Sequence, residues 1–194
     1  MKYDSQKHNR KSIRLPGHNY SQEGHYFVTI CTEKRRLFFG KIENEKMVLN
    51  KLGAIIKQEW LKTPKIRKNV KLDEFIIMSN HIHGIIIIND QSTCVGAYCN
   101  TPRRNTPKNK NNNDRAYCNT PLRSPSHTLG AIIRGFKSTT TKQINLQFGY
   151  NYFAWQRNYY EHIIKDEESL YNIRRYIIDN PKNWQTDRNN PDNF

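Results

Sequence analysis

The sequence predicts a single α+β domain in which an antiparallel sheet has helices packed on one face. Short β-rich runs alternate with helix-like runs in the order β-α-β-β-α-β-α. Consecutive strands in the middle of this order favour an antiparallel sheet over a parallel one. The length of 194 residues is enough for one domain with a hydrophobic core.

The N-terminal part combines a basic arm, a strand and a helix. Residues 1–24 are polar and basic, and we expect them to form an arm ahead of one domain over residues 25–194. The run HYFVTICT (25–32) is typical of a first strand. We expect a helix to begin at Met47 and to end at Pro64. Its apolar residues recur at helical spacing: Leu52, Ile55, Ile56 and Trp60.

The middle of the chain predicts two strands and then an insertion. LDEFIIMS (72–79) and HIHGIIII (81–88) are typical of consecutive strands joined by a turn at Ser79–Asn80. Residues 91–127 are rich in Asn, Thr, Pro, Lys and Arg, and they contain the hexapeptide AYCNTP twice. This composition is too polar for a separate core, so we interpret the segment as a low-complexity insertion.

The C-terminal part predicts helix, strand and helix. Residues 126–147 keep a helical apolar spacing and begin with a capping residue, Ser126 or Thr128. The aromatic run YFAWQRNYYEHIIK (152–165) is typical of a strand. The final helix has Asp166 as its N-cap and stops before Pro181. Together the elements give the ferredoxin-like plan of two split βαβ units.

The charge of the chain indicates a polyanionic partner. The formal net charge is +15, and nucleic acid is the commonest partner of such a protein, with a membrane surface as the alternative. The sequence has no apolar run near the ~18–20 residues of a spanning helix and no signal-peptide pattern, so we expect a cytoplasmic protein. The candidate DNA contacts are Arg14, Lys34, Arg35, Arg36, Lys65, Arg67, Lys68, Arg134, Lys137, Lys142, Arg157, Arg174 and Arg175.

Two histidines suggest a metal site. His81 and His83 are two residues apart on an expected strand, so their imidazoles lie on one face while Ile82 points to the other. Two neutral imidazoles can form half of a metal site and leave positions for other ligands. A cation held there beside a phosphodiester would polarise it.

Such a site also needs a nucleophile. Water would give a nuclease, whereas a tyrosine oxygen would give a covalent protein–DNA intermediate. Tyr176 flanks the buried stripe of the last helix, where it could face the sheet or simply close the core edge. Tyr159 and Tyr160 are rivals. Trp155 and these two tyrosines suit packing or base stacking, and His162 is a candidate neighbour of the site.

Four segments in order carry a family resemblance. FVTICT, LDEFIIMSNHIHGIIII, GAIIRGFKS and WQRNYYEHIIKDEESLYNIRRYIIDNP together resemble the REP-associated tyrosine transposases (RAYT), a branch of the single-tyrosine HUH transposases. The similarity spans about residues 12–90 and 128–192 and excludes the insertion. It implies a ferredoxin-like HUH fold whose C-terminal helix carries the nucleophile.

The resemblance also implies roles for individual residues. His81 and His83 would bind a divalent metal, Mg²⁺ or Mn²⁺, and Tyr176 in YIIDNP would be the nucleophile. Asn180 stands where related transposases have a glutamine as third metal ligand. Arg174 and Arg175 could hold a phosphate or ease tyrosinate formation. The implied reaction is cleavage and rejoining of single-stranded or hairpin DNA through a 5′-phosphotyrosine link, by a monomer or a homodimer.

Three other interpretations remain open at this point. A domesticated descendant would bind DNA hairpins without cutting them. A metal-dependent nuclease would use water as the nucleophile. A ferredoxin-like RNA-binding module would read bases with aromatic residues on its sheet, yet the expected open face here carries histidines.

Overall fold

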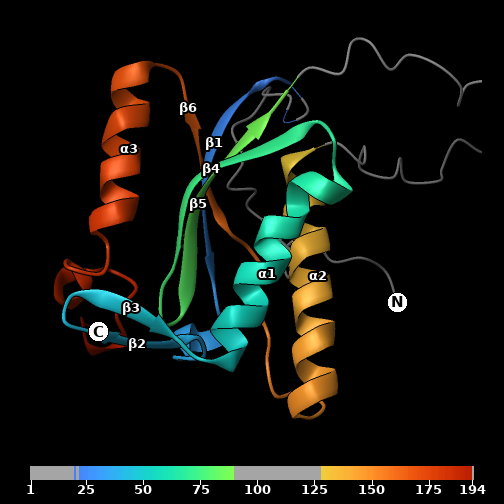
Figure 1. Ribbon diagram of the computed structural model, residues 1–194, viewed down its shortest axis with the longest axis vertical. Coiled ribbons are helices and arrows are strands. Elements are labelled where there is room, and N and C mark those ends of the chain that lie inside the picture. Colours follow the sequence, from blue (N-terminus) through green and yellow to red (C-terminus); the bar gives the residue numbers. More distant parts are fainter. Residues whose placement is uncertain (1–19, 21, 90–127, 194) are drawn as a thin grey trace, which may run out of the picture.

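The computed structural model describes residues 20, 22–89 and 128–193 (Figure 1). The predicted insertion at about 91–127 lies outside these residues, as does most of the predicted arm. Among the described helices, none has the length and hydropathy needed to cross a membrane.

One antiparallel sheet forms the centre of the domain. Its strands are β1 (Gly24–Cys31), β4 (Val70–Ile77), β5 (His81–Ile88) and β6 (Tyr160–Ile164), in the spatial order β4-β5-β1-β6. Each neighbouring pair is antiparallel. Because β1 and β5 occupy the centre and the two halves of the chain interleave, the predicted α+β ferredoxin-like class is confirmed.

Three helices cover the two faces of this sheet. The helices α1 (Lys51–Ile66) and α2 (Leu129–Phe148) lie side by side on one face, as predicted, and α3 (Glu167–Asp179) lies on the other (Figure 1). The predicted packing on one face therefore holds for α1 and α2, whereas α3 buries Leu170 and Ile177 in a second core. Thr128 caps α2 by accepting from the Ala131 N–H, and Asp166 caps α3 by accepting from the Ser169 N–H. Both caps are among those that the sequence predicts.

The alternation of β5 divides its residues between two cores. Ile82, Ile86 and Ile88 face α1 and α2, whereas Ile85 faces α3. Gly84 allows a close contact on the first face, because a Cβ there would lie 2.7 Å from the Trp60 ring. The two histidines share the face of Ile85, since residues two apart on a strand point the same way.

The prediction of a helix from Met47 is wrong at its start. Residues Lys46–Leu49 form strand β3, which pairs with β2 (Gly40–Glu43) in a separate hairpin. Asn44 and Glu45 turn this hairpin with φ of 50° and 60°, as a two-residue hairpin turn requires. The helix begins only after Asn50, whose side chain accepts from the Gly53 N–H.

Two further element boundaries differ from the predictions. Pro64 lies inside α1 near its end, where one missing N–H does not stop the last two residues from continuing. The predicted aromatic strand is limited to Tyr160–Ile164, because Phe153 and Trp155 are buried in the core ahead of it. Short 3₁₀ turns complete the fold at Glu33–Arg35, Trp184–Thr186 and Pro191–Asn193.

Candidate active site

His81 and His83 lie together beneath α3 and the segment that follows it. Both side chains have an exposed fraction of 0%. Their ring centroids are 4.4 Å apart, and the Trp184 indole is 6.0 Å from the His81 ring at an interplanar angle of 25°. The sheet face that the sequence presents as open is therefore covered over these two residues.

A saturated asparagine fixes the tautomer of His81. The Asn80 side-chain NH₂ donates to two carbonyls, Arg35 O at 2.9 Å and Asn189 O at 2.8 Å. Its Oδ1 must therefore accept from His81 Nδ1, at 2.8 Å. The lone pair of His81 is then on Nε2, which is buried without a hydrogen-bond partner among the described residues. A histidine held this way is oriented as metal-binding histidines are.

His83 contacts a hydroxyl on each side. Its Nδ1 lies 2.8 Å from Thr29 Oγ1, on the neighbouring strand β1. Its Nε2 lies 3.3 Å from the hydroxyl of Tyr176 on α3. The imidazole can therefore donate to Thr29 and accept from the phenol.

Asp187 completes a cluster with the two histidines. One ligand atom from each of His81, His83 and Asp187 lies within 4.8 Å of the others, and all three residues are buried. Asp187 accepts from Asn180 Nδ2 at 3.0 Å and from the Asn189 N–H at 2.5 Å. This cluster could hold a metal ion.

Unpartnered lone pairs test whether a cation fits here. Asn180 Nδ2 donates to the Asp187 carboxylate, and Asn180 Oδ1 is a buried acceptor that no donor of the described residues meets with hydrogen-bond geometry. His81 Nε2 is likewise a buried acceptor without a hydrogen-bond partner among the described residues. Buried acceptors without donors are costly in an empty protein interior and suit a cation, so the residues fit a metal.

Burial keeps both histidines neutral. Desolvation, followed by the nearby Arg188 and Arg35, lowers the pKa of His81 to about 3. Burial, followed by His81 itself, also holds the pKa of His83 well below its usual value. Neutral imidazoles are the form that binds metals.

Acid is expected to destabilise the metal-free protein through these histidines. The unfolded chain takes up a proton on each of them near pH 6.5, whereas the folded chain does not until about pH 3 for His81. Stability from this source is therefore intact above pH 6.5 and falls below it, by about 2 kcal/mol at pH 5 for His81, and His83 adds a loss in the same direction.

Urea unfolding at pH 7 and pH 5, in the presence of a chelator, measures this loss. His81→Gln should show a pH-dependent loss smaller by about 2 kcal/mol, because one of the two protons is no longer involved. Equal losses in both proteins would contradict the burial of a neutral His81.

Tyr176 reaches the histidines from α3 while staying open to solvent on one side. Its side chain is 42% exposed, and its ring meets Phe27 edge-on with centroids 6.0 Å apart. Burial is the main cause that raises the pKa of this phenol, and Asp187 adds to it, whereas Arg188 acts in the opposite sense. The hydroxyl is therefore protonated at neutral pH.

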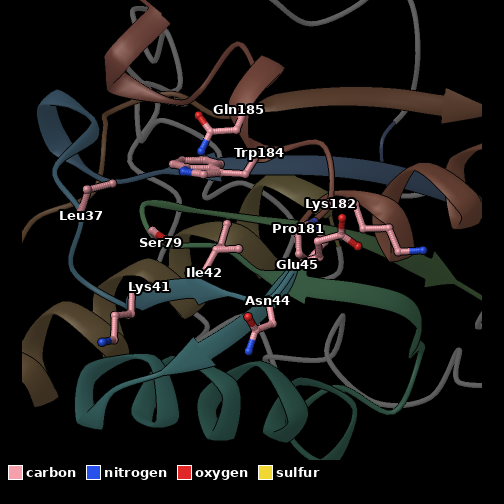
Figure 2. A pocket seen from close by; sticks show the side chains of 11 residues that line it. Leu37, Lys41, Ile42, Asn44, Glu45, Ser79, Pro181, Lys182, Trp184 and Gln185 are labelled. Carbon is pink, nitrogen blue, oxygen red and sulfur yellow. The ribbon is translucent and has the colours of Figure 1, made fainter.

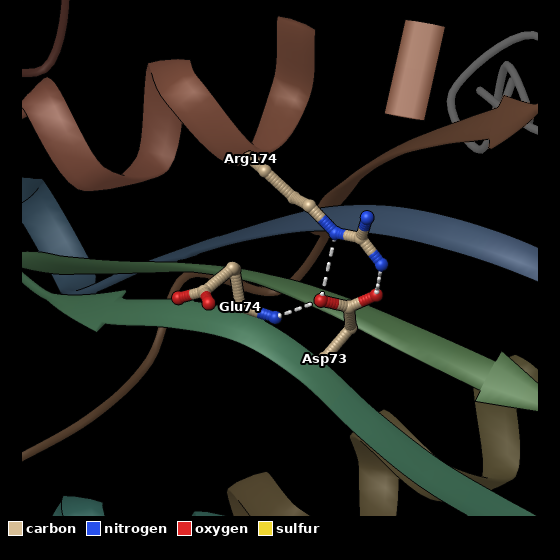
Figure 3. Close-up of polar contacts among 3 residues, drawn as sticks. All are labelled: Asp73, Glu74 and Arg174. Atoms are coloured by element: carbon tan, nitrogen blue, oxygen red, sulfur yellow. Dashed lines mark hydrogen bonds and ion pairs between the residues drawn. The ribbon is translucent and has the colours of Figure 1, made fainter. Parts of the chain in front are cut away.

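An ion pair attaches α3 to the edge strand β4. Arg174 donates from Nε and Nη2 to the two carboxylate oxygens of Asp73, at 3.0 and 2.5 Å (Figure 3). Asp73 lies where the register of β4 and β5 shifts, and its Oδ1 also accepts from the Glu74 N–H at 2.7 Å. Arg175 pairs with Asp179 at 3.3 Å. In this arrangement both arginines form ion pairs, one between α3 and β4 and one within α3.

Other predicted DNA contacts divide into engaged and exposed side chains. Lys137 Nζ donates to the carbonyls of Gln156 and Asn158, each at 2.8 Å, and Arg67 Nη2 donates to Ala131 O at 3.1 Å. Burial lowers the pKa of Lys137 to about 8. Arg14 lies outside the described residues. The side chains that remain at the surface are Lys34, Arg36, Lys65, Lys68, Arg134, Lys142 and Arg157.

The rival aromatic residues lie in different places. Tyr160 is 46% exposed, and its ring meets Phe27 edge-on at 6.3 Å, on the same sheet face as the histidines. His162 is two residues further along β6 and is exposed. Trp155 is buried in the opposite core and donates from Nε1 to Thr140. Tyr159 packs against that core as well.

Sequence reasoning missed two residues of this site, Asp187 and Arg188. The Arg188 guanidinium lies 5.3 Å from the Tyr160 ring centroid, and Arg35 donates to the Arg188 backbone carbonyl at 2.7 Å. Both residues follow the 3₁₀ turn Trp184–Thr186, in a segment without helical or strand periodicity. The only signal was a carboxylate among amides in the run TDRNNP.

Comparisons with known proteins give the family and the fold of the chain. No protein-family model matches the chain. An uncharacterized protein of Haemophilus influenzae is 41% identical over 187 residues, which cover 96% of each chain. A REP-associated tyrosine transposase, solved bound to a REP hairpin, aligns over 89% of this chain and 74% of its own, with 13% identity and a TM-score of 0.53.

A second solved structure, of a protein assigned as a transposase from Deinococcus radiodurans, aligns over 85% of this chain and 96% of its own. Its identity is 12%, and its TM-score of 0.43 is too low to establish a common fold. The chain therefore belongs to one family with the Haemophilus influenzae protein, and its fold is that of the REP-associated tyrosine transposases.

Proposed function

We propose that this protein is a transposase that cuts and rejoins single-stranded or hairpin DNA through a covalent link to Tyr176. The observation that carries the proposal is the hydroxyl of Tyr176 lying 3.3 Å from His83, beside a cluster that could hold a metal. The solved protein that shares the fold was bound to a REP hairpin, which supports a similar substrate.

His81, His83 and Asp187 would hold the cation, and the Asn180 amide oxygen is available beside them. Imidazoles with a carboxylate suit Mn²⁺ better than Mg²⁺, which prefers oxygen ligands alone. When bound, the cation supplies Lewis-acid polarisation of the scissile phosphate. The proposed set adds Asp187 to the predicted ligands His81, His83 and Asn180.

The chain's own residues would carry out the transfer. The Tyr176 oxygen forms a bond to phosphorus and releases its proton to water, while the bond from phosphorus to the 3′ oxygen breaks. The 3′ oxygen takes up a proton and leaves as a 3′-OH, and the 5′ end stays on the tyrosine as a phosphodiester. Attack by another 3′-OH reverses these steps and rejoins the strand.

Arg188 is the cation best placed to contact the phosphate. It lies over Tyr160 and acts electrostatically on Tyr176, and the described residues show no ion pair for it. The exposed basic side chains would contact the DNA backbone further away, so each contact steepens the dependence of binding on salt. Tyr176 lies beside His83 of its own chain, so the proposed reaction does not require a residue from a second copy. A DNA substrate also agrees with the expected cytoplasmic location.

An adduct assay tests the proposal. The protein is incubated with a hairpin oligonucleotide that carries one fluorophore at its 5′ end and a second one at its 3′ end, drawn from palindromic repeats that flank the coding region, with Mn²⁺ or with a chelator. The 5′ fluorophore follows the released strand and the 3′ fluorophore follows the strand that becomes linked to the protein. A nicked strand and a band of protein-linked DNA on a denaturing gel, both dependent on Mn²⁺, are expected. Cleavage without a linked band would instead indicate a metal-dependent nuclease.

One observation favours that nuclease as a second candidate. The raised pKa of Tyr176 disfavours the phenolate, so water could compete as the nucleophile. Binding of the hairpin without any cleavage would support the other alternative, a protein that holds hairpins and does not transfer strands.

A further inference from the structure

A pocket of about 460 Å³ lies next to the candidate active site, between the β2–β3 hairpin and the segment that follows α3 (Figure 2). Its volume falls within the range of sites that hold small molecules, about 300–1,000 Å³. Asn44 and Glu45 from the hairpin turn and Trp184 and Gln185 from the C-terminal segment contribute to its lining. The tyrosine mechanism uses none of these four side chains.

The pocket offers two apolar surfaces for a flat ring. Figure 2 shows the indole of Trp184 almost edge-on, with the side chain of Ile42 below it and Ser79 beside it. Tryptophan presents a large π face, on which nucleobases and other aromatic rings stack. Ile42 adds an aliphatic surface to the same lining, so the slot for a ring has two apolar side chains in its wall.

Hydrogen-bonding groups surround this slot. The side-chain amides of Asn44 and Gln185 and the carboxylate of Glu45 belong to the lining. Among the described residues, no hydrogen bond engages the amides of Asn44 and Gln185. They can therefore donate to and accept from the edge of a ligand, as the amides that read bases do.

The same indole connects the pocket to the metal cluster. Trp184 stacks on His81 with centroids 6.0 Å apart, and Pro181 and Lys182 in the lining directly follow Asn180. The Trp184 side chain therefore separates a ring stacked on it from His81 and from the scissile phosphate of the proposed reaction. The spacing of consecutive nucleotides in an extended DNA strand is comparable with this separation between the ring and the phosphate.

We propose that this pocket binds the unpaired nucleobase of a nucleotide adjacent to the scissile phosphate, by stacking it against Trp184. The inference rests on the proposed function, since it places the base of the same DNA strand. Lys41 and Lys182 line the pocket too, each paired with an acid, Glu43 at 2.6 Å and Asp179 at 3.6 Å. A base with its phosphate suits this combination of a ring surface and flanking ammonium groups.

The affinities of the protein for two fluorescent oligonucleotides of about 20 nucleotides test base binding in the pocket. One is oligothymidylate, and the other has the same phosphate backbone with abasic sites throughout. The unmodified protein should bind oligothymidylate at least about fivefold more tightly, because stacking adds to backbone contacts. Ile42→Trp, which fills the slot, should reduce this ratio severalfold and leave affinity for the abasic strand unchanged.

Val48→Trp is the matched control, since it adds the same ring to the same hairpin outside the pocket lining. It should keep the wild-type ratio. A second measurement needs no variant: oligothymidylate carrying 5-iodouracil, irradiated in complex with the unmodified protein, should crosslink to Trp184.

The results separate this inference from the proposed function. Three results would overturn base binding in the pocket while adduct formation by Tyr176 stands. They are equal affinity for both strands, an unchanged affinity ratio in Ile42→Trp, and crosslinks only at residues other than Trp184. If the protein binds neither strand, the proposed function fails and the inference fails with it.

Discussion

Replacement of Tyr176 by phenylalanine is expected to abolish the protein–DNA adduct, with a loss of at least about 10³-fold. The change removes only the hydroxyl that lies 3.3 Å from His83. The ring keeps its contact with Phe27, so folding should be nearly intact, with a cost of about 1 kcal/mol for the lost hydrogen bond. Denaturing gels measure the adduct, and fluorescence anisotropy of the labelled hairpin shows that binding survives.

Two other tyrosines provide controls. Tyr171→Phe changes the same helix at an exposed position and should leave the adduct unchanged. Tyr160→Phe changes the rival on the same sheet face and should reduce cleavage only modestly. An adduct that persists in Tyr176→Phe and disappears in Tyr160→Phe would transfer the role of nucleophile to β6.

Loss of metal binding is the second large effect, and it is expected from His81→Ala. This change removes the buried, unpartnered Nε2 that the geometry directs at the cluster. In the wild type, Mn²⁺ should raise the melting temperature, because a ligand that binds only the folded state stabilises it. The variant should lose this shift and all Mn²⁺-dependent cleavage. Calorimetric titration with Mn²⁺ gives the affinities directly, without reference to activity.

The two remaining candidate ligands can be ranked in the same experiment. Asp187→Asn should weaken Mn²⁺ by roughly 10–100-fold or more, because it removes the negative charge of the cluster. Asn180→Ala should have a smaller effect, since its Oδ1 is neutral and its NH₂ also orients Asp187. If Asn180→Ala abolishes Mn²⁺ binding and Asp187→Asn does not, the predicted ligand set would be preferred over the one assigned from the cluster.

The features that could be predicted from the sequence depend on regular periods. The strand period places His81 and His83 on one face, and the helical period brings Tyr176 to the sheet side of α3, next to buried Ile177. The caps Thr128 and Asp166 follow the same kind of local rule. These elements are determined by neighbours in the sequence, so a single sequence is enough to predict them.

The features that were missed depend on contacts between distant segments. Asp187 follows a 3₁₀ turn, where no period links a residue to its partner, and its position near the histidines becomes clear only in three dimensions. The pairing of Arg174 with Asp73 likewise needs α3 to lie beside β4, so sequence proximity to Tyr176 suggested another role. The β2–β3 hairpin was missed because Asn44–Glu45 lacks the glycine that marks such turns.

The central claim is that one phenol and one metal cluster act on the same phosphate. Digestion of the adduct with nuclease and protease, followed by mass spectrometry, locates the linkage on the chain. A nucleotide phosphate attached to Tyr176, formed only with a divalent metal and absent from His81→Ala, is the result predicted here. A phosphate on any other residue, or the same linkage formed in the presence of chelator, would contradict it.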